Sequence, residues 1–91
     1  MLRLNCFIQV SDECRCEVLE CAKRLTEASL LQDGCVAYDV FESATRRDVM
    51  MICETWRDQS ALDAHSDSEV FAREVGWIKE LAELKLEVFP F

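Results

Sequence analysis

Apolar and polar side chains alternate along residues 2–10, and this two-residue period is typical of a β-strand whose faces lie in different environments. One face is apolar throughout and consists of Leu2, Leu4, Cys6, Ile8 and Val10. The other face is mixed and carries Arg3, Asn5, Phe7 and Gln9. Similar apolar runs predict further strands at residues 35–42, 49–56 and 84–89.

A helix is predicted between the first two strands, because apolar residues recur at spacings of three and four from residue 14 to residue 28. Ser11 or Asp12 is expected to cap its start. Gly34 is expected to end it, since glycine adopts the left-handed conformation without penalty.

The second helical region is predicted after the third strand. Asp58 is a suitable N-cap for a helix over residues 59–65. After a break near residues 66–68, helical spacing resumes and continues to Leu81, although Gly76 lowers the helix propensity there.

The predicted order of elements is strand-helix-strand-strand-helix-strand. This order indicates a ferredoxin-like α+β fold, in which an antiparallel sheet has helices on one face, and residues 1–91 are long enough for one such domain. Leu2, Leu4, Ile8 and Val10 alone would leave a large apolar patch on an uncovered sheet face. We therefore expect two copies to pair their sheets in a homodimer.

The composition excludes several classes of partner. The formal net charge is −8, and such an acidic chain is a poor match for nucleic acid or for an anionic membrane surface. The chain has no apolar run near the roughly 18–20 residues of a membrane-spanning helix, and its start does not resemble a signal peptide. A cytoplasmic protein is the expectation.

Six cysteines raise the question of disulfides or metal binding. Cys6 and Cys53 fall in predicted strands, Cys21 lies on the apolar stripe of the first helix, and Cys35 follows a glycine. These are positions where free cysteine serves as a small buried apolar residue. Residues 14–16 read Cys-Arg-Cys, which is not the Cys-x-x-Cys spacing of zinc or redox sites, so no metal is expected.

The most distinctive segment is residues 54–65, which read Glu-Thr-Trp-Arg-Asp-Gln-Ser-Ala-Leu-Asp-Ala-His. It ends with His65, the only histidine in the chain, whose ordinary pKa of about 6.5 suits acid–base chemistry. Upstream, residues 34–38 read Gly-Cys-Val-Ala-Tyr, and Phe71 follows downstream. Together these segments resemble the antibiotic biosynthesis monooxygenase domain family, small ferredoxin-like proteins in which a Gly-Cys-x-x-Tyr strand precedes a Glu-x-Trp…Ala-Leu…His turn.

The resemblance implies a dimeric α/β barrel and a cofactor-independent reaction. Several members of the family oxygenate quinol-like or polyketide-derived phenols without metal or flavin, because the deprotonated substrate itself gives an electron to dioxygen. The protein then has to supply an apolar slot, a base and hydrogen-bond donors. The chain has no glycine-rich phosphate loop, dinucleotide fingerprint, nucleophile elbow or His-Glu-x-x-His motif, which agrees with this expectation.

Three residues are candidates for catalysis: His65 as the base, with Asn5 and Trp56 as hydrogen-bond donors. The expected substrate contacts are Tyr38, Phe7, Met51, Phe71 and Trp77, and Phe41 and Met50 are further candidates for the slot. Each of these residues also has a structural interpretation: His65 as a residue that caps or packs a helix end, Asn5 as the partner of a neighbouring loop, and the aromatic and methionine residues as part of the core. Glu54 is expected either to orient His65 or to pair with Arg57 or Arg73.

Two other functions remain open at this point. An isomerase of a small phosphorylated sugar would also use a histidine base, and Arg46, Arg47, Arg57 and Arg73 are available for its phosphate. A dimeric module that binds a small molecule without turnover is the second. Converging arginines would favour the phosphate, whereas an apolar slot with His65 at its mouth would favour the phenol. A heme-degrading branch of the family ligates iron through a histidine in the second helix. The matching position in this chain falls near Val75, and valine cannot bind iron, so heme degradation is not expected.

Overall fold

The fold is ferredoxin-like, as predicted, in the computed structural model, which describes all of residues 1–91. The elements in chain order are β1 (Leu2–Val10), α1 (Arg15–Ser29), β2 (Cys35–Glu42), β3 (Val49–Trp56), α2 (Gln59–Ser66), α3 (Glu69–Leu81) and β4 (Ala82–Pro90). The four strands form one antiparallel sheet in the order β2-β3-β1-β4. The bounds of β1, β2 and β3 match those predicted from the two-residue period.

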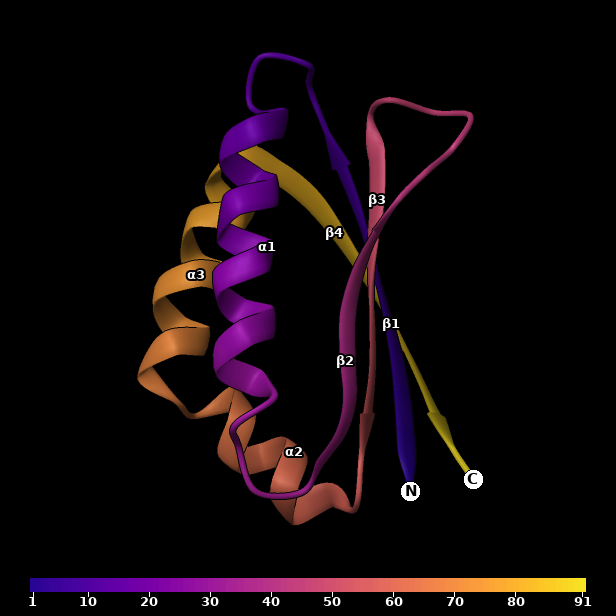
Figure 1. The fold of residues 1–91 in the computed structure, drawn as a ribbon, viewed down its shortest axis with the longest axis vertical. Helices are drawn as coiled ribbons and strands as arrows, with labels where there is room; N and C mark the ends of the chain where they lie inside the picture. Colours follow the sequence, from indigo (N-terminus) through magenta and orange to yellow (C-terminus); the bar gives the residue numbers. More distant parts are fainter.

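The molecule has two layers, with the helices on one face of the sheet (Figure 1). Helices α1 and α3 lie next to each other over the sheet, and the short α2 closes the end of the molecule where β3 ends. The core fills the space between the layers. Its buried apolar residues include Leu4, Ile8, Val18, Leu25, Met50, Ile52, Trp56 and Ile78.

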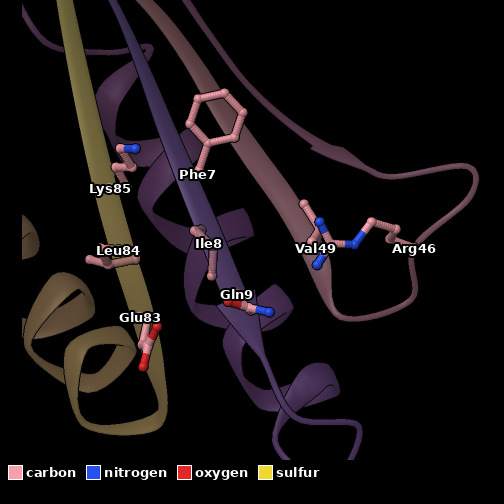
Figure 2. A pocket seen from close by; sticks show the side chains of 8 residues that line it. All are labelled: Phe7, Ile8, Gln9, Arg46, Val49, Glu83, Leu84 and Lys85. Carbon is pink, nitrogen blue, oxygen red and sulfur yellow. The ribbon is translucent and has the colours of Figure 1, made fainter.

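The structure corrects the prediction of which β1 residues are left uncovered. Leu4, Ile8 and Val10 point toward the helices and are at most 3% exposed, because the helices cover the more apolar face of the strand. The face without helices carries Phe7 and Phe41, which are 39% and 49% exposed. Figure 2 shows Phe7 standing off β1 beside a shallow hollow at one end of the sheet, with Lys85 on the neighbouring β4. An apolar patch does exist on the open face, but different residues form it.

The predicted capping of α1 is wrong at both ends. Neither Ser11 nor Asp12 caps the helix: residues 12–14 form a turn, the N-cap is Cys14 without a side-chain bond, and the Asp12 carboxylate pairs with Arg47 instead. The helix ends at Ser29, before Gly34 is reached.

Gly34 serves a different turn, the one that leads into β2. Its φ is +80°, and its carbonyl oxygen accepts a hydrogen bond from the Arg57 amide at 2.8 Å. A Cβ at this position would overlap the Cβ of Ala61, so glycine allows the loop before β2 to approach α2 closely. Asp58 caps α2 as predicted, since its carboxylate accepts a hydrogen bond from the Ala61 amide.

An ion pair joins the two long helices. The buried carboxylate of Glu74 on α3 accepts hydrogen bonds from the guanidinium of Arg24 on α1 at 3.0 and 3.1 Å. Arg73 donates a further bond at 3.2 Å. These arginines, Arg24 above all, lower the pKa of the Glu74 carboxyl, so the pair is charged at neutral pH.

Candidate active site

A cavity of about 290 Å³ lies between the sheet and the helices α2 and α3. Its walls are apolar except for the side chains of Glu54, His65, Ser66 and Lys79 and the phenolic side chain of Tyr38. An apolar cavity with a few polar groups aimed into it is the usual form of a small-molecule site. The chemistry of this cavity therefore depends on those few polar groups.

His65 reaches the cavity because of how α2 begins and ends. Asp58 fixes the start of the helix, and Ala61 and His65, four residues apart, are the two residues that α2 buries. The helix ends one residue later. The Ser68 hydroxyl donates to the His65 carbonyl oxygen at 2.7 Å and, as the N-cap of α3, accepts from the Phe71 backbone amide. His65 thus lies at the corner between two helices.

Three aromatic rings surround the imidazole of His65. The Trp56 ring lies 4.5 Å away between centroids and is tilted by 34°, and the Phe71 ring lies edge-on at 5.2 Å. The Tyr38 ring is 5.6 Å away. These contacts bury the imidazole to 2% exposure, which lowers the pKa of His65 to about 4. The ring is therefore neutral at pH 7.

The two nitrogens of His65 have different environments. Nδ1 lies 2.6 Å from the side-chain oxygen of Gln32, in the loop before β2. A carbonyl oxygen only accepts, so this contact favours the tautomer with the proton on Nδ1 and the lone pair on Nε2. Nε2 is buried without a hydrogen-bond partner, 4.0 Å from the carboxylate of Glu54. A buried acceptor without a protein partner costs about 1–3 kcal/mol, so this nitrogen is free to bond to a water or a ligand in the cavity.

Glu54 is the second titratable group of the cavity. It lies on the helix-covered face of β3, is 6% exposed, and its carboxylate accepts a hydrogen bond from the Trp56 indole N–H at 2.8 Å. Burial raises the pKa of Glu54, and the hydrogen bonds of Trp56 and Tyr38 oppose that rise. Trp56 therefore fixes the Glu54 carboxylate in place, directly opposite the free nitrogen of His65.

The structure brings together part of the predicted site. His65, Tyr38 and Phe71 line the cavity, and Trp56 lies behind them against both His65 and Glu54. Trp56 was expected to offer its N–H to a substrate, but that N–H is already bonded to Glu54. Glu54 pairs with neither Arg57 nor Arg73, whose partners are Asp33, Asp58 and Glu74.

The remaining predicted residues lie elsewhere. Asn5, Phe7 and Met51 occupy the open face of the sheet, because they alternate with the residues of β1 and β3 that face the helices. Phe41 lies on the same open face, and Met50 is buried in the core. Trp77 is 50% exposed on α3 and does not line the cavity.

Two residues of the site were underestimated or missed from the sequence. Glu54 was considered only as a partner for His65 or an arginine, although its position two residues before Trp56 places both on one strand face. Gln32 carries no local signal at all, because its contact with His65 joins a loop to a helix that is distant in sequence. The structure contains no group of three or more side chains suited to hold a metal ion, and its six cysteines are all free. No helix has the length and apolar character needed to cross a membrane.

Comparison with known proteins identifies the family and the fold that this chain shares. A model of the family described as "Antibiotic biosynthesis monooxygenase" matches residues 1–76. The protein "Putative monooxygenase YcnE" of Bacillus subtilis is 32% identical over 88 residues, which cover 97% of this chain and 93% of that protein. A crystal structure of a conserved protein of unknown function from Bacteroides thetaiotaomicron superposes with a TM-score of 0.98 at 54% identity and covers 99% of this chain and 96% of that one.

A more distant structure shares the fold alone. SnoaB of Streptomyces nogalater, a cofactor-independent oxygenase, superposes with a TM-score of 0.88 at 13% identity. The superposition covers 99% of this chain and 91% of SnoaB.

Proposed function

Because this chain belongs to the antibiotic biosynthesis monooxygenase family, we propose that it is a cofactor-independent monooxygenase that oxidises a quinol or a related phenol with dioxygen. The observation that carries the proposal is the buried, unpartnered Nε2 of His65 in an apolar cavity. Such a nitrogen is placed to accept the hydrogen bond, and then the proton, of a phenolic hydroxyl. The apolar walls fit the aromatic rings of that substrate.

The proposed reaction begins when His65 takes the phenolic proton at Nε2. The imidazolium that forms lies 4.0 Å from the Glu54 carboxylate. At that distance two opposite charges attract by about 4 kcal/mol at an effective dielectric constant of about 20. Glu54 in its charged form thus raises the proton affinity of a histidine that burial alone makes a weak base. Burial also raises the pKa of Tyr38, so its hydroxyl stays protonated at the cavity wall.

The deprotonated substrate then supplies all the electrons. It passes them to dioxygen, one oxygen atom enters the product, and the other leaves as water. With S for the substrate skeleton, the balanced reaction is SH₂ + O₂ → SO + H₂O. The proton held by His65 returns to the oxygen that becomes water. Exclusion of bulk water by the aromatic rings around His65 strengthens each electrostatic interaction within the cavity.

Oxygen uptake over a panel of naphthoquinols and anthrone-like phenols tests the proposal. We expect uptake well above the spontaneous oxidation of each compound, and a loss of about 100-fold or more in a His65→Ala variant, as for removal of a general base. Gln59→Ala is the matched control, since Gln59 lies on the same helix, is exposed, and bonds only to Asp63. Uptake equal to that of buffer with every compound would contradict the proposal for this substrate class.

The alternative isomerase has less support. Arg46, Arg47, Arg57 and Arg73 are exposed, each pairs with a carboxylate, and none lines the cavity. A phosphate in this cavity would meet only Lys79 as a cationic side chain. Binding of a quinol without oxygen uptake would identify the third candidate, a module that holds a small molecule without turnover.

We also propose that the protein works as a homodimer joined through the open face of its sheet. Phe7, Met51 and Phe41 lie side by side on β1, β3 and β2 of that face, and Phe89 of β4 is 48% exposed there. Apolar side chains grouped on one face are typical of an interface. Light scattering at micromolar concentration should give twice the mass of one chain, and Phe7→Glu should shift it toward the monomer. A monomeric wild-type protein would contradict this part of the proposal.

A further inference from the structure

We propose that Gln32 is a positioning residue, which holds His65 with its proton on Nδ1 and thereby keeps Nε2 as an acceptor toward the cavity. The catalytic meaning of this inference rests on the proposed function. Its structural content does not, because the tautomer of His65 is a property of the resting protein.

The imidazole of His65 separates two hollows. On one side is the apolar cavity, toward which Nε2 faces Glu54. On the other side is a surface hollow of about 250 Å³, lined by Gln32, Asp33, Arg57, Ser60, Ala61, Ala64 and His65. Gln32 is half-buried on this outer side and meets Nδ1 at 2.6 Å. A single hydrogen bond from outside thus decides which nitrogen is free inside.

The loop that carries Gln32 is fixed by its backbone and by a neighbouring ion pair. The backbone N–H of Gln32 donates to the backbone carbonyl oxygen of Ser29 at 3.0 Å, and the backbone carbonyl oxygen of Gln32 accepts from the backbone N–H of Cys35 at 3.2 Å. The Arg57 amide donates to the Gly34 carbonyl oxygen, and the Arg57 guanidinium pairs with Asp33 at 3.2 Å. The side chain of Gln32 therefore starts from a defined backbone position opposite α2.

An amide differs from a carboxylate as the partner of Nδ1. Its oxygen fixes the tautomer of the ring without adding a negative charge, so it does not favour the charged imidazolium in the resting protein. An amide oxygen is also too weakly basic to take the Nδ1 proton. A proton that Nε2 accepts from the substrate therefore has no exit through Nδ1, and it returns from Nε2 to the oxygen that becomes water.

None of the titratable groups around His65 forms a hydrogen bond with either of its ring nitrogens. Glu54 of β3 and Tyr38 of β2 face the ring from the sheet, and Lys79 of α3 lines the same cavity. Asp33 and Arg57 line the outer hollow but are paired with each other. Gln32 is the only side chain within hydrogen-bond distance of either ring nitrogen.

The test is the ¹⁵N spectrum of the imidazole, which contains one pair of ring signals because His65 is the only histidine. Wild-type protein at pH 7 should show a neutral ring protonated at Nδ1. Gln32→Leu should shift the ring signals toward the other tautomer, and Gln59→Leu should leave them unchanged. Gln32→Glu should keep the proton on Nδ1 and raise the titration midpoint of the ring. An Nε2-protonated wild-type ring, or a Gln32→Leu ring identical to wild type, would overturn the inference.

The kinetic arm separates this inference from the proposed function. Oxygen uptake should fall by about two- to tenfold in Gln32→Leu, the value of one net hydrogen bond. In Gln32→Glu the acidic limb of the pH profile should move to higher pH. The spectrum is read without substrate, so the expected spectrum in a protein that takes up no oxygen would leave the positioning role intact and refute the oxygenase. If Gln32→Leu does not fold, the wild-type tautomer and the titration midpoint of Gln32→Glu test the inference in its place.

Discussion

Substitution of Gly34 by alanine should destabilise the protein strongly. Gly34 has a φ of +80°, and a residue with a Cβ in the left-handed region costs about 1–2 kcal/mol. The new Cβ would also overlap Ala61 Cβ on α2, and overpacking of this kind costs about 1–3 kcal/mol. The free energy of unfolding should therefore fall by roughly 2–5 kcal/mol. For a urea m-value of about 1–3 kcal/mol/M, the unfolding midpoint should fall by roughly 0.7–5 M.

The other glycine of the chain is the control. Gly76 lies in α3, and a Cβ there would meet no atom within 4 Å. Alanine should raise the free energy of unfolding by about 0.5–1 kcal/mol through helix propensity alone. The two Gly→Ala variants should therefore move the urea midpoint in opposite directions. A Gly34→Ala variant within 0.5 kcal/mol of wild type would refute the argument from backbone conformation and close packing.

Three further predictions concern titratable groups. The folded-state pKa of His65 is about 4, below the ordinary 6.5, so the unfolded chain binds a proton on His65 at a higher pH than the folded protein does. The free energy of unfolding should therefore fall as the pH drops from about 6.5 to 4, by up to about 3 kcal/mol more than in His65→Phe, as measured by urea unfolding at each pH. Glu74→Gln should lower the free energy of unfolding by about 1–3 kcal/mol at pH 7, because Arg24 loses its carboxylate partner. Since Arg24 lowers the pKa of Glu74, this loss should shrink as the pH falls below the ordinary carboxyl range, and a loss that does not change with pH would argue against an ionic origin. Glu54→Gln should lower oxygen uptake while leaving quinol binding within about threefold, because the carboxylate stabilises an imidazolium that forms only during the reaction, and equal losses in binding and turnover would contradict this role.

The two-residue period located β1, β2 and β3 correctly because each strand separates two different environments. The same period could not say which face the helices cover, since Phe7 and Met51 make the open face partly apolar as well. That ambiguity placed Asn5, Phe7 and Met51 in the expected slot. It is resolved only by the packing of α1 and α3 on the sheet, which local sequence does not determine.

Part of the candidate site could likewise be predicted from the sequence, and part could not. His65 and Trp56 were recognisable because their residue types are rare in this chain and carry chemistry. The pairing of Glu54 with Trp56 follows from strand alternation and was within reach of the sequence. The contact between Gln32 and His65 was not, because it depends on the close approach of a loop and a helix that Gly34 permits. A contact between a loop and a helix that are distant in sequence has no periodic signature.

The cavity borders the core, so an occupant would extend the hydrophobic interior and could bond to the buried Nε2 of His65. Binding and folding are therefore thermodynamically linked in this protein. A ligand at 100 times its dissociation constant adds about 2.7 kcal/mol to the free energy of unfolding. In a chain of this length that corresponds to a rise in melting temperature on the order of 10–20 °C. Melting temperature alone can thus rank candidate substrates before any reaction has been observed.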